Sequence, residues 1–321
     1  MRIIVAVLIS FFVSSAAFAS DPCVAHKPAS PRLMRLEQAM AQDRFVAYNP
    51  TELKVIDGMI TKASKESIRA DLALLRNHFD GIITYSARDG NEYVADIAAE
   101  LGYKALIVGL WSPADPEEVR NAIRMAKAHP DLVVGMSLGN ELILGKRSTW
   151  QQIGQYVTLM RSRIPDMPLT VTEPFAQFLD SDSSDVRDSL DFMLVNVHPI
   201  FESWFATAGP DNWADFVVKV TGKLSDKFCG PIIVKETGVP SGPADKGFTP
   251  DKQAAFWKAL QVQMKPSKSA AYAWFAAFDA PWRISDFNPM GGNHPEEAYW
   301  GLFSEARAPK PVVDVIPKLK N

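Results

Sequence analysis

The sequence predicts a single-domain (β/α)8 TIM barrel of the α/β class, and three observations predict it. Apolar, β-branched runs alternate with helical stretches along almost the whole chain of 321 residues. Most of these runs are continuously apolar, which is typical of parallel strands buried on both faces. There are eight runs with helices between them, which matches the eight repeats of a barrel. A doubly wound open sheet is the alternative, but the sequence has neither the G-x-G-x-x-G nor the G-x-x-x-x-G-K-[ST] phosphate loop expected of one.

The individual elements are predicted from local sequence. Strands are expected at residues 44–48, 81–85, 104–110, 132–138, 169–172, 192–197, 232–234 and 271–278. A helix is expected to begin at Asp115-Pro116, because Asp is a favoured N-cap and Pro suits the first helical position. Thr249-Pro250 repeats this pattern, and residues 148–151 have the spacing of a capping box. Further helices are expected at 65–77, 92–101, 212–223 and 251–264.

Residues 1–19 have the features of a secretory signal peptide. Met1-Arg2 is followed by a short apolar stretch, and Ala17-Phe18-Ala19 is an A-x-A cleavage site. A permanent membrane anchor is the alternative, but the apolar run is short for a membrane span. The predicted division is therefore a signal peptide at 1–19, an N-terminal segment at 20–43 and a catalytic barrel at 44–321. After cleavage the protein is expected to be secreted or periplasmic, without contact with a membrane.

Composition argues against several classes of function. Hydrophobic residues make up 47% of the chain, and the formal net charge of −3 leaves no basic field that would attract nucleic acid. The five histidines show no H-x-H or H-E-x-x-H spacing, so neither a metal ion nor another cofactor is expected. Cys23 and Cys229 either form a disulfide after export or remain two separate thiols. The sequence does not determine the oligomeric state.

Polar side chains gather where two of the predicted strands end. Functional groups of a barrel lie at the C-terminal ends of its strands. Asn140-Glu141 follows the fourth predicted strand, and Glu236 follows the seventh. Two carboxylates across such a mouth suit glycosidic bond cleavage, in which one donates a proton to the leaving oxygen and the other attacks the anomeric carbon; a separation of about 5–5.5 Å gives retention of configuration. Asn140 is expected to hydrogen-bond the sugar 2-hydroxyl.

Each of these residues also has a purely structural explanation. A glutamate at a strand end often serves as an ion-pair partner or a loop anchor, and Lys235 beside Glu236 invites that interpretation. Neighbours along a strand point to opposite faces, however, so Lys235 is expected to be a poor partner for Glu236. His198, which follows the sixth strand, could be a satisfied core histidine. Glu173, at the end of the fifth strand, is expected to be a decoy rather than a member of the catalytic pair.

Together with the E-T-G-x-P-S motif at residues 236–241, the Asn140-Glu141 pair resembles glycoside hydrolase family 17, the β-1,3-glucanases and related glucanosyltransferases. The likeness extends over most of the chain that follows the signal peptide. It implies a retaining barrel enzyme in which Glu141 is the general acid/base and Glu236 is the nucleophile. The residues that would line the substrate site are Tyr48, Tyr85, Asn140, His198, Phe278, Asp279 and Trp282. Flat apolar faces for stacking sugar rings are offered by Trp111, Trp204, Trp282 and Trp300.

The sequence departs from the family pattern at four positions. Val239 stands where the family usually has Trp, Ile200 where it has an aromatic residue, Ile83 where it has Arg, and Ala276 where it has Glu. These changes leave both glutamates in place but alter the subsites. The function implied is an exported retaining hydrolase that acts on β-1,3-linked glucan oligo- or polysaccharide by double displacement. A β-1,3-glucanosyltransferase with the same site, and a glucan-binding barrel with little or no turnover, are the alternatives.

Overall fold

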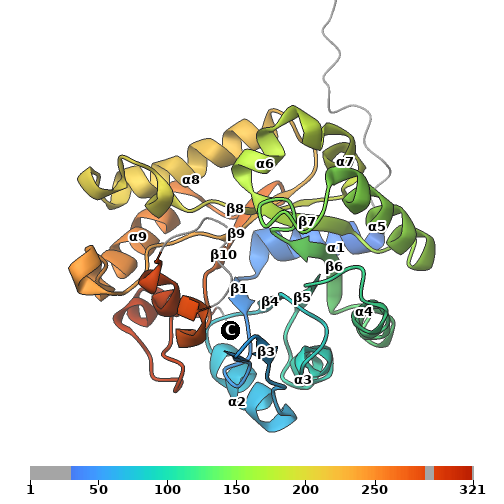
Figure 1. The fold of residues 1–321 in the computed structure, drawn as a ribbon, viewed down its shortest axis with the longest axis horizontal. Coiled ribbons are helices and arrows are strands. Elements are labelled where there is room, and N and C mark those ends of the chain that lie inside the picture. Colours follow the sequence, from blue (N-terminus) through green and yellow to red (C-terminus); the bar gives the residue numbers. More distant parts are fainter. Residues whose placement is uncertain (1–29, 286–292, 320–321) are drawn as a thin grey trace, which may run out of the picture.

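The computed structural model describes residues 30–285 and 293–319, and its centre is a closed barrel of eight parallel strands (Figure 1). Around the barrel the order is β1-β10-β9-β8-β7-β6-β5-β4. The bounds of the strands are β1 (Phe45–Tyr48), β4 (Gly81–Thr84), β5 (Ala105–Leu110), β6 (Val133–Asn140), β7 (Leu169–Pro174), β8 (Met193–Asn196), β9 (Ile232–Glu236) and β10 (Ala270–Trp274). Each of the eight predicted runs overlaps one of these strands, and β6, β7, β9 and β10 extend beyond the predicted ranges. Because β1 pairs with β10 as well as with β4, the barrel prediction is confirmed and an open sheet is excluded.

Helices cover the outside of the barrel (Figure 1). Those that connect barrel strands are α2 (Lys65–Leu75), α3 (Val94–Glu100), α4 (Pro116–Ala128), α5 (Trp150–Arg163), α6 (Phe175–Leu179), α7 (Ser184–Ser189), α8 (Pro210–Ser225) and α9 (Pro250–Gln263). Asp115 caps α4 as expected, and its side chain accepts hydrogen bonds from the amides of Glu117 and Glu118. The capping box of α5 is formed by Thr149 and Gln152, one residue later than the sequence predicts. The short helices α6 and α7 are too brief to show a helical period, and the sequence does not predict them.

A further helix, α1 (Pro31–Gln42), packs against the end of the barrel where the strands begin. Its buried side chains, among them Leu36 and Met40, belong to the same apolar cluster as Phe45 and the other side chains inside the barrel. The helix therefore completes the barrel core. The sequence places these residues in a separate N-terminal segment, 20–43, because nothing local shows which surface the apolar face of α1 covers.

The predicted signal peptide and Cys23 lie outside the described residues. Cys229 is disulfide-bonded, and Cys23 is the one other cysteine of the chain. Within 30–285 and 293–319, no helix is long and apolar enough to cross a membrane. The same ranges hold no group of three His, Cys, Asp or Glu side chains that could bind a metal ion.

The connection from β1 to α2 carries a small antiparallel hairpin of β2 (Val55–Ile56) and β3 (Met59–Ile60). Asp57 and Gly58 form its turn with φ angles of 50° and 75°. Two consecutive positive φ angles fit the two-residue loops that the twist of a hairpin favours. Since the hairpin follows a barrel strand, it lies at the C-terminal face of the barrel, where the mouth is.

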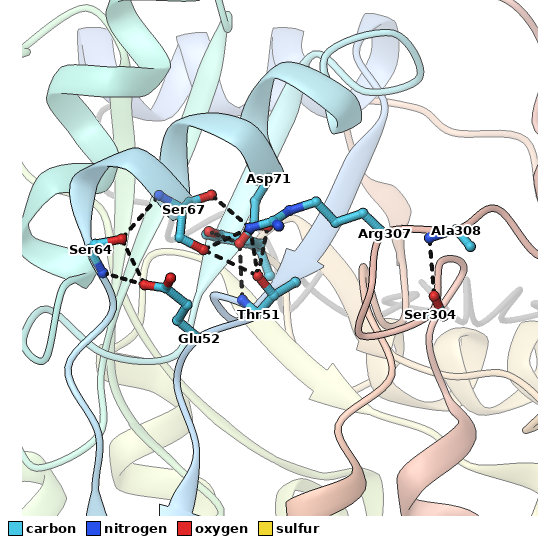
Figure 2. A network of polar contacts seen from close by, with 9 residues as sticks. Thr51, Glu52, Ser64, Ser67, Asp71, Ser304, Arg307 and Ala308 are labelled. Atoms are coloured by element: carbon cyan, nitrogen blue, oxygen red, sulfur yellow. Dashed lines mark hydrogen bonds and ion pairs between the residues drawn. The ribbon is translucent and has the colours of Figure 1, made fainter.

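A polar network beside α2 holds the C-terminal segment against the barrel (Figure 2). The carboxylate of Asp71 is fully buried and accepts hydrogen bonds from Tyr48 Oη (2.9 Å), Thr51 N (3.0 Å) and Thr51 Oγ1 (2.9 Å). It also pairs with Arg307 Nε at 2.7 Å, and Arg307 donates to the Ser67 hydroxyl at 2.7 Å. Burial raises the pKa of Asp71, while the hydrogen bonds and the charge of Arg307 oppose the rise. The network thus satisfies a buried carboxylate and anchors residues near the end of the chain.

Asp71→Asn is expected to lower the free energy of unfolding by about 3 kcal/mol, because breaking a buried ion pair leaves its partner uncompensated. The amide has the size of the carboxylate, but it carries no charge and its nitrogen cannot accept hydrogen bonds. Urea unfolding followed by circular dichroism measures the change. Asp188→Asn is the matched control, since the Asp188 side chain is 69% exposed and its loss should cost less than about 0.5 kcal/mol. Equal midpoints for the two variants would contradict a stabilising role for the network.

Candidate active site

An irregularity in β9 brings two neighbouring charged side chains to the same place. Val195 of β8 pairs with Val234, and the next residue of β8, Asn196, pairs with Glu236, so Lys235 is an extra residue in β9. Such a bulge interrupts the alternation of side chains between the two faces of a strand. Lys235 Nζ consequently lies 3.6 Å from Glu236 Oε1. The expectation that these neighbours are poor partners is wrong, because it holds only in a regular strand.

The end of β6 is irregular as well, and this places the second glutamate. The register with β7 shifts between Ser137 and Asn140. Gly139 in that interval has a φ of 118°, which a residue with a side chain rarely adopts. Glu141 follows with a φ of 52°, and its amide donates to Thr172 O at 2.8 Å. The bent strand end therefore delivers Asn140 and Glu141 together at the mouth.

Glu141 is held by a residue of a third strand. Asn196 Nδ2 at the end of β8 donates a hydrogen bond of 2.9 Å to Glu141 Oε1. Asn196 is 1% exposed, so the bond is shielded from water. The contact fixes one carboxyl oxygen of Glu141 and leaves the other available for chemistry.

Glu236 lies among several groups that favour its ionised form. Its side chain is buried, with Lys235 Nζ 3.6 Å from one carboxyl oxygen and His198 Nε2 3.6 Å from the other. Lys235 Nζ also donates to Asn140 Oδ1 at 2.7 Å. The guanidinium of Arg283, from the 3-10 helix Pro281–Ser285, adds a further positive charge.

The environment pushes the two glutamate pKa values in opposite directions. Burial, and then the negative charge of Glu236, raise the pKa of Glu141. Burial also acts to raise the pKa of Glu236, but the contact with His198 and the charges of Lys235 and Arg283 outweigh it and lower that pKa below its usual range. Of the two groups, Glu141 is thus the one whose protonated form is favoured and Glu236 the one whose ionised form is favoured. Carboxyl pairs separated in this way provide one acid and one anion.

Aromatic side chains surround the glutamates on the inside of the mouth. Tyr85, Phe275 and Trp300 form one buried cluster. The ring of His198 lies 5.1 Å from that of Trp300 and 5.5 Å from that of Phe275. The buried polar atoms here with no hydrogen-bond partner among the described residues are Tyr85 Oη, Asn196 Oδ1, His198 Nδ1, Glu236 Oε1 and Trp300 Nε1. Since buried polar groups are normally paired, these five atoms stand out as unsatisfied within the protein itself.

Tyr48 and Phe278, which are both predicted to line the site, lie outside it. Tyr48 is hydrogen-bonded to Asp71 and packs in the layer between the strands and the helices. Phe278 lies in the same layer, with its ring centroid 6.3 Å from that of Tyr48 and 5.9 Å from that of Phe303. The structure corrects both assignments, because these side chains point away from the mouth.

Asp279 is also corrected, and the tryptophans divide between the mouth and the outer layer. Asp279 accepts hydrogen bonds from Gly301 N (2.8 Å) and Lys310 Nζ (2.7 Å), so it anchors the C-terminal segment. Trp300 belongs to the site cluster, whereas Trp204 packs against Phe216 with ring centroids 5.4 Å apart. Trp111 is 41% exposed at the end of β5, and Trp282 is half-buried beside Arg283.

Sequence reasoning missed three residues of the site: Lys235, Asn196 and Arg283. Arg283 pairs with Glu297 at 2.7 Å, and it lies 5.8 Å from the centre of the Phe275 ring. Neither the bulge in β9 nor the path of this loop has a local signal. Asn196 did have a local signal, because it lies near the end of the predicted strand at 192–197.

The four departures from the family pattern lie in different surroundings. Ile83 belongs to the apolar cluster inside the barrel, so no charge stands there. Lys235 and Arg283 instead provide positive charge near the nucleophile candidate. Ile200 and Ala276 pack against the aromatic cluster of the mouth. Val239 is buried in the outer layer, so its replacement of an aromatic residue changes the packing behind the site.

Glu173, the predicted decoy, anchors a loop. Its carboxylate accepts hydrogen bonds from Ile143 N (2.8 Å) and Leu144 N (3.3 Å). Burial raises the pKa of Glu173 to about 7, although these hydrogen bonds oppose the rise. Because the two amides lie two and three residues after Glu141 in the chain, Glu173 supports the loop that carries Glu141.

Glu173 is expected to make stability fall as pH rises from about 4.5 to about 7. The pKa of the group is 4.5 before folding and about 7 in the folded protein. Between these values the folded state holds more protons than the unfolded state, so the free energy of unfolding decreases as pH rises. In Glu173→Gln this decrease should be smaller by roughly 3 kcal/mol, at about 1.4 kcal/mol per pKa unit. Urea unfolding at pH 4.5 and 7 tests it, and identical slopes for the two proteins would refute the assignment.

Residues 46–301, which include both glutamates, match the family model of the BtgE/BtgC glycoside hydrolase domain. A glucan 1,3-beta-glucosidase from Arthroderma benhamiae is 22% identical to this chain over 75% of its length and 82% of the relative's. The probable family 17 glucosidase SCW10 from Saccharomyces cerevisiae is 25% identical over 75% of this chain and 61% of the relative. The chain belongs to glycoside hydrolase family 17.

Solved structures of other proteins share its fold, and one of them is named as a member of family 17. The β-1,3-glucanosyltransferase from Rhizomucor miehei superposes with a TM-score of 0.61 at 18% identity, covering 84% of this chain and 95% of that one. An endo-laminarinase from Formosa superposes with a TM-score of 0.60 at 17% identity, covering 82% and 83%. The family membership confirms the resemblance drawn from the two glutamate motifs, and with it the assignment of this protein as a glycosidase.

Proposed function

We propose that this family 17 glycosidase is exported and cleaves β-1,3-linked glucan with retention of configuration. The observation that carries the proposal is the pair of carboxyls at the ends of β6 and β9, in which half-buried Glu141 is favoured as the acid and buried Glu236 as the anion. The substrate is proposed from the printed names of the relatives, a glucan 1,3-beta-glucosidase and a β-1,3-glucanosyltransferase among them.

In the first step, Glu236 attacks the anomeric carbon while Glu141 gives its proton to the glycosidic oxygen. The bond between carbon and leaving oxygen breaks, a bond to the Glu236 carboxyl oxygen forms, and Glu141 is left ionised. The hydrogen bond from Asn196 steadies Glu141 in both charge states, because its amide donates to either. Lys235 and Arg283 hold Glu236 in the ionised form that attack requires.

In the second step, Glu141 removes a proton from an incoming water and the water oxygen attacks the same carbon. The glycosyl bond to Glu236 breaks, and inversion twice at one carbon gives net retention. A sugar hydroxyl in place of water gives a new glycosidic bond, so transfer is the second candidate function. The similarity to a solved glucanosyltransferase motivates it.

Incubation with laminari-oligosaccharides separates these possibilities. Products analysed by chromatography and mass spectrometry should include shorter chains, and proton NMR at early times should show the β-anomer first. Chains longer than the substrate would establish transfer. Binding without any product would favour a glucan-binding barrel, and neither binding nor products would overturn the substrate assignment. Cello- and gentio-oligosaccharides are the matched controls for linkage.

Export is proposed from residues 1–19 and is supported by the disulfide at Cys229, since disulfides persist in oxidising compartments. The mature protein is proposed to begin after Ala19. N-terminal sequencing of protein secreted or released from the periplasm tests this. An intact Met1 would contradict the cleavage.

A further inference from the structure

Lys235 is a buried cation at the base of the active site for which the double displacement itself has no chemical step. It is 1% exposed, and its Nζ lies 2.7 Å from Asn140 Oδ1, 3.6 Å from Glu236 Oε1 and 3.7 Å from the centre of the Tyr85 ring. The bulge in β9 puts it there, since a regular strand would direct residue 235 away from Glu236. Burying an ammonium group is costly unless its neighbours compensate. The protein nevertheless buries this ammonium group beside Glu236, the candidate nucleophile.

The contact with Asn140 decides how that amide is oriented. An ammonium group has only donors, so the atom of Asn140 facing Nζ at 2.7 Å is the carbonyl oxygen. The amide nitrogen must then point elsewhere and is available as a donor. Asn140 directly precedes Glu141 at the mouth. Its side-chain nitrogen, rather than its oxygen, is therefore the atom placed to meet a sugar hydroxyl, and it does so as a donor.

The contact between Lys235 and Glu236 favours the ionised form of the Glu236 carboxyl. Glu236 Oε1 is buried and has no hydrogen-bond partner among the described residues, and the Lys235 ammonium is the positive group nearest to it in the described contacts. The other charged and titratable groups around Glu236 are His198 after β8, Glu141 after β6, Arg283 from the 3-10 helix Pro281–Ser285 and Tyr85 after β4. Besides these groups, Lys235 contacts Glu236, and its ammonium also donates to the Asn140 side chain.

We propose that Lys235 is a positioning residue that couples the nucleophile to the sugar 2-hydroxyl. One ammonium keeps Glu236 an anion and fixes Asn140 as the donor to that hydroxyl. The inference rests on the proposed glycosidase site and adds a residue to it that acts through Asn140 and Glu236. Loss of Lys235 should therefore impair two interactions at once.

A double-mutant-type cycle, which combines substitution of Lys235 with removal of the substrate 2-hydroxyl, tests whether Lys235 acts on the interaction with that hydroxyl. The substrates are 2,4-dinitrophenyl β-laminaribioside and its analogue lacking the 2-hydroxyl on the reacting sugar. In the wild-type protein, removing that hydroxyl should lower kcat/KM strongly, and in Lys235→Met the same removal should cost roughly ten- to a hundredfold less, the range expected for groups that interact directly. Equal costs in the two proteins would overturn the proposal.

Lys235→Gln separates the two roles and guards against a variant that fails to fold. Its amide can still donate to Asn140 but carries no charge, so it should retain more of the 2-hydroxyl dependence than Met does. Both variants are checked by circular dichroism before assay. If both variants fold and show the same hydroxyl dependence as the wild type, Lys235 does not orient Asn140.

A second measurement needs no turnover. Carbon-13 NMR of glutamate-labelled protein follows carboxyl titrations, and Glu236→Gln identifies the signal of Glu236. The pKa of Glu236 should be higher in Lys235→Met and Lys235→Gln than in the wild type, and an unchanged value would overturn the charge role. A wild type that is inactive on every glucan but shows this shift would refute the proposed function while leaving the charge role of Lys235 in place.

Discussion

Glu236→Gln is expected to lower kcat on a β-1,3-glucan by at least about 10⁴-fold while the barrel stays folded, since removal of a nucleophile costs up to about 10⁶-fold in other hydrolases. The amide has the shape of the carboxylate but cannot form the glycosyl intermediate. Activity on laminari-oligosaccharides and thermal unfolding measure the two parts of the prediction. Binding of the same oligosaccharides, measured by calorimetry, should persist, because the aromatic cluster of the mouth is untouched.

The structure decides which substitution to use at this position. Glu236 is 4% exposed, and its charge compensates the buried ammonium of Lys235. Glu236→Ala would leave that cation uncompensated, at a cost of about 3–5 kcal/mol when a buried pair is broken. Loss of activity in the alanine variant could therefore reflect unfolding, whereas the glutamine variant isolates chemistry. Turnover above one per cent of wild type in folded Glu236→Gln would rule out its role as the nucleophile.

Glu141→Gln is expected to lose activity in proportion to how much the leaving group needs a proton. On laminari-oligosaccharides the loss should be about 10²–10⁴-fold, the usual contribution of a general acid. A 2,4-dinitrophenyl glycoside leaves without protonation, so formation of the glycosyl-enzyme should be nearly unaffected. Gln at this position can still accept the hydrogen bond from Asn196, so the side chain should stay in place.

The pH profile provides a second test of Glu141. Its pKa is raised by burial and by the charge of Glu236, so in the wild type the proton needed for the first step persists to higher pH than in an ordinary glutamate. Above that pKa, kcat/KM should fall as pH rises, and this alkaline limb should disappear in Glu141→Gln. Glu117→Gln, on the exposed surface of α4, is the matched control and should behave as wild type. If Glu141→Gln lost equal activity on laminari-oligosaccharides and on the 2,4-dinitrophenyl glycoside, Glu141 would be excluded as the acid.

The parts of the fold that were predictable depend on signals within short segments. Continuous apolar runs identify strands buried on both faces, and the cap and proline at Asp115-Pro116 identify the start of a helix. Position in the chain then places Glu141 and Glu236 at the mouth, because every strand of a parallel barrel ends on the same face. The sequence by itself therefore determined the barrel, the family and the two glutamates.

The directions of individual side chains were decided only by the tertiary structure. Tyr48 and Phe278 point into the outer layer, since their partners, Asp71 and Phe303, come from distant parts of the chain. Lys235 joins the site because β9 carries one more residue than its pairing with β8 requires, a property of two strands together. Pairing register, and contacts between segments far apart in sequence, arise only when the barrel closes. That is the physical reason why the sequence identifies the two candidate glutamates but not the cation beside them.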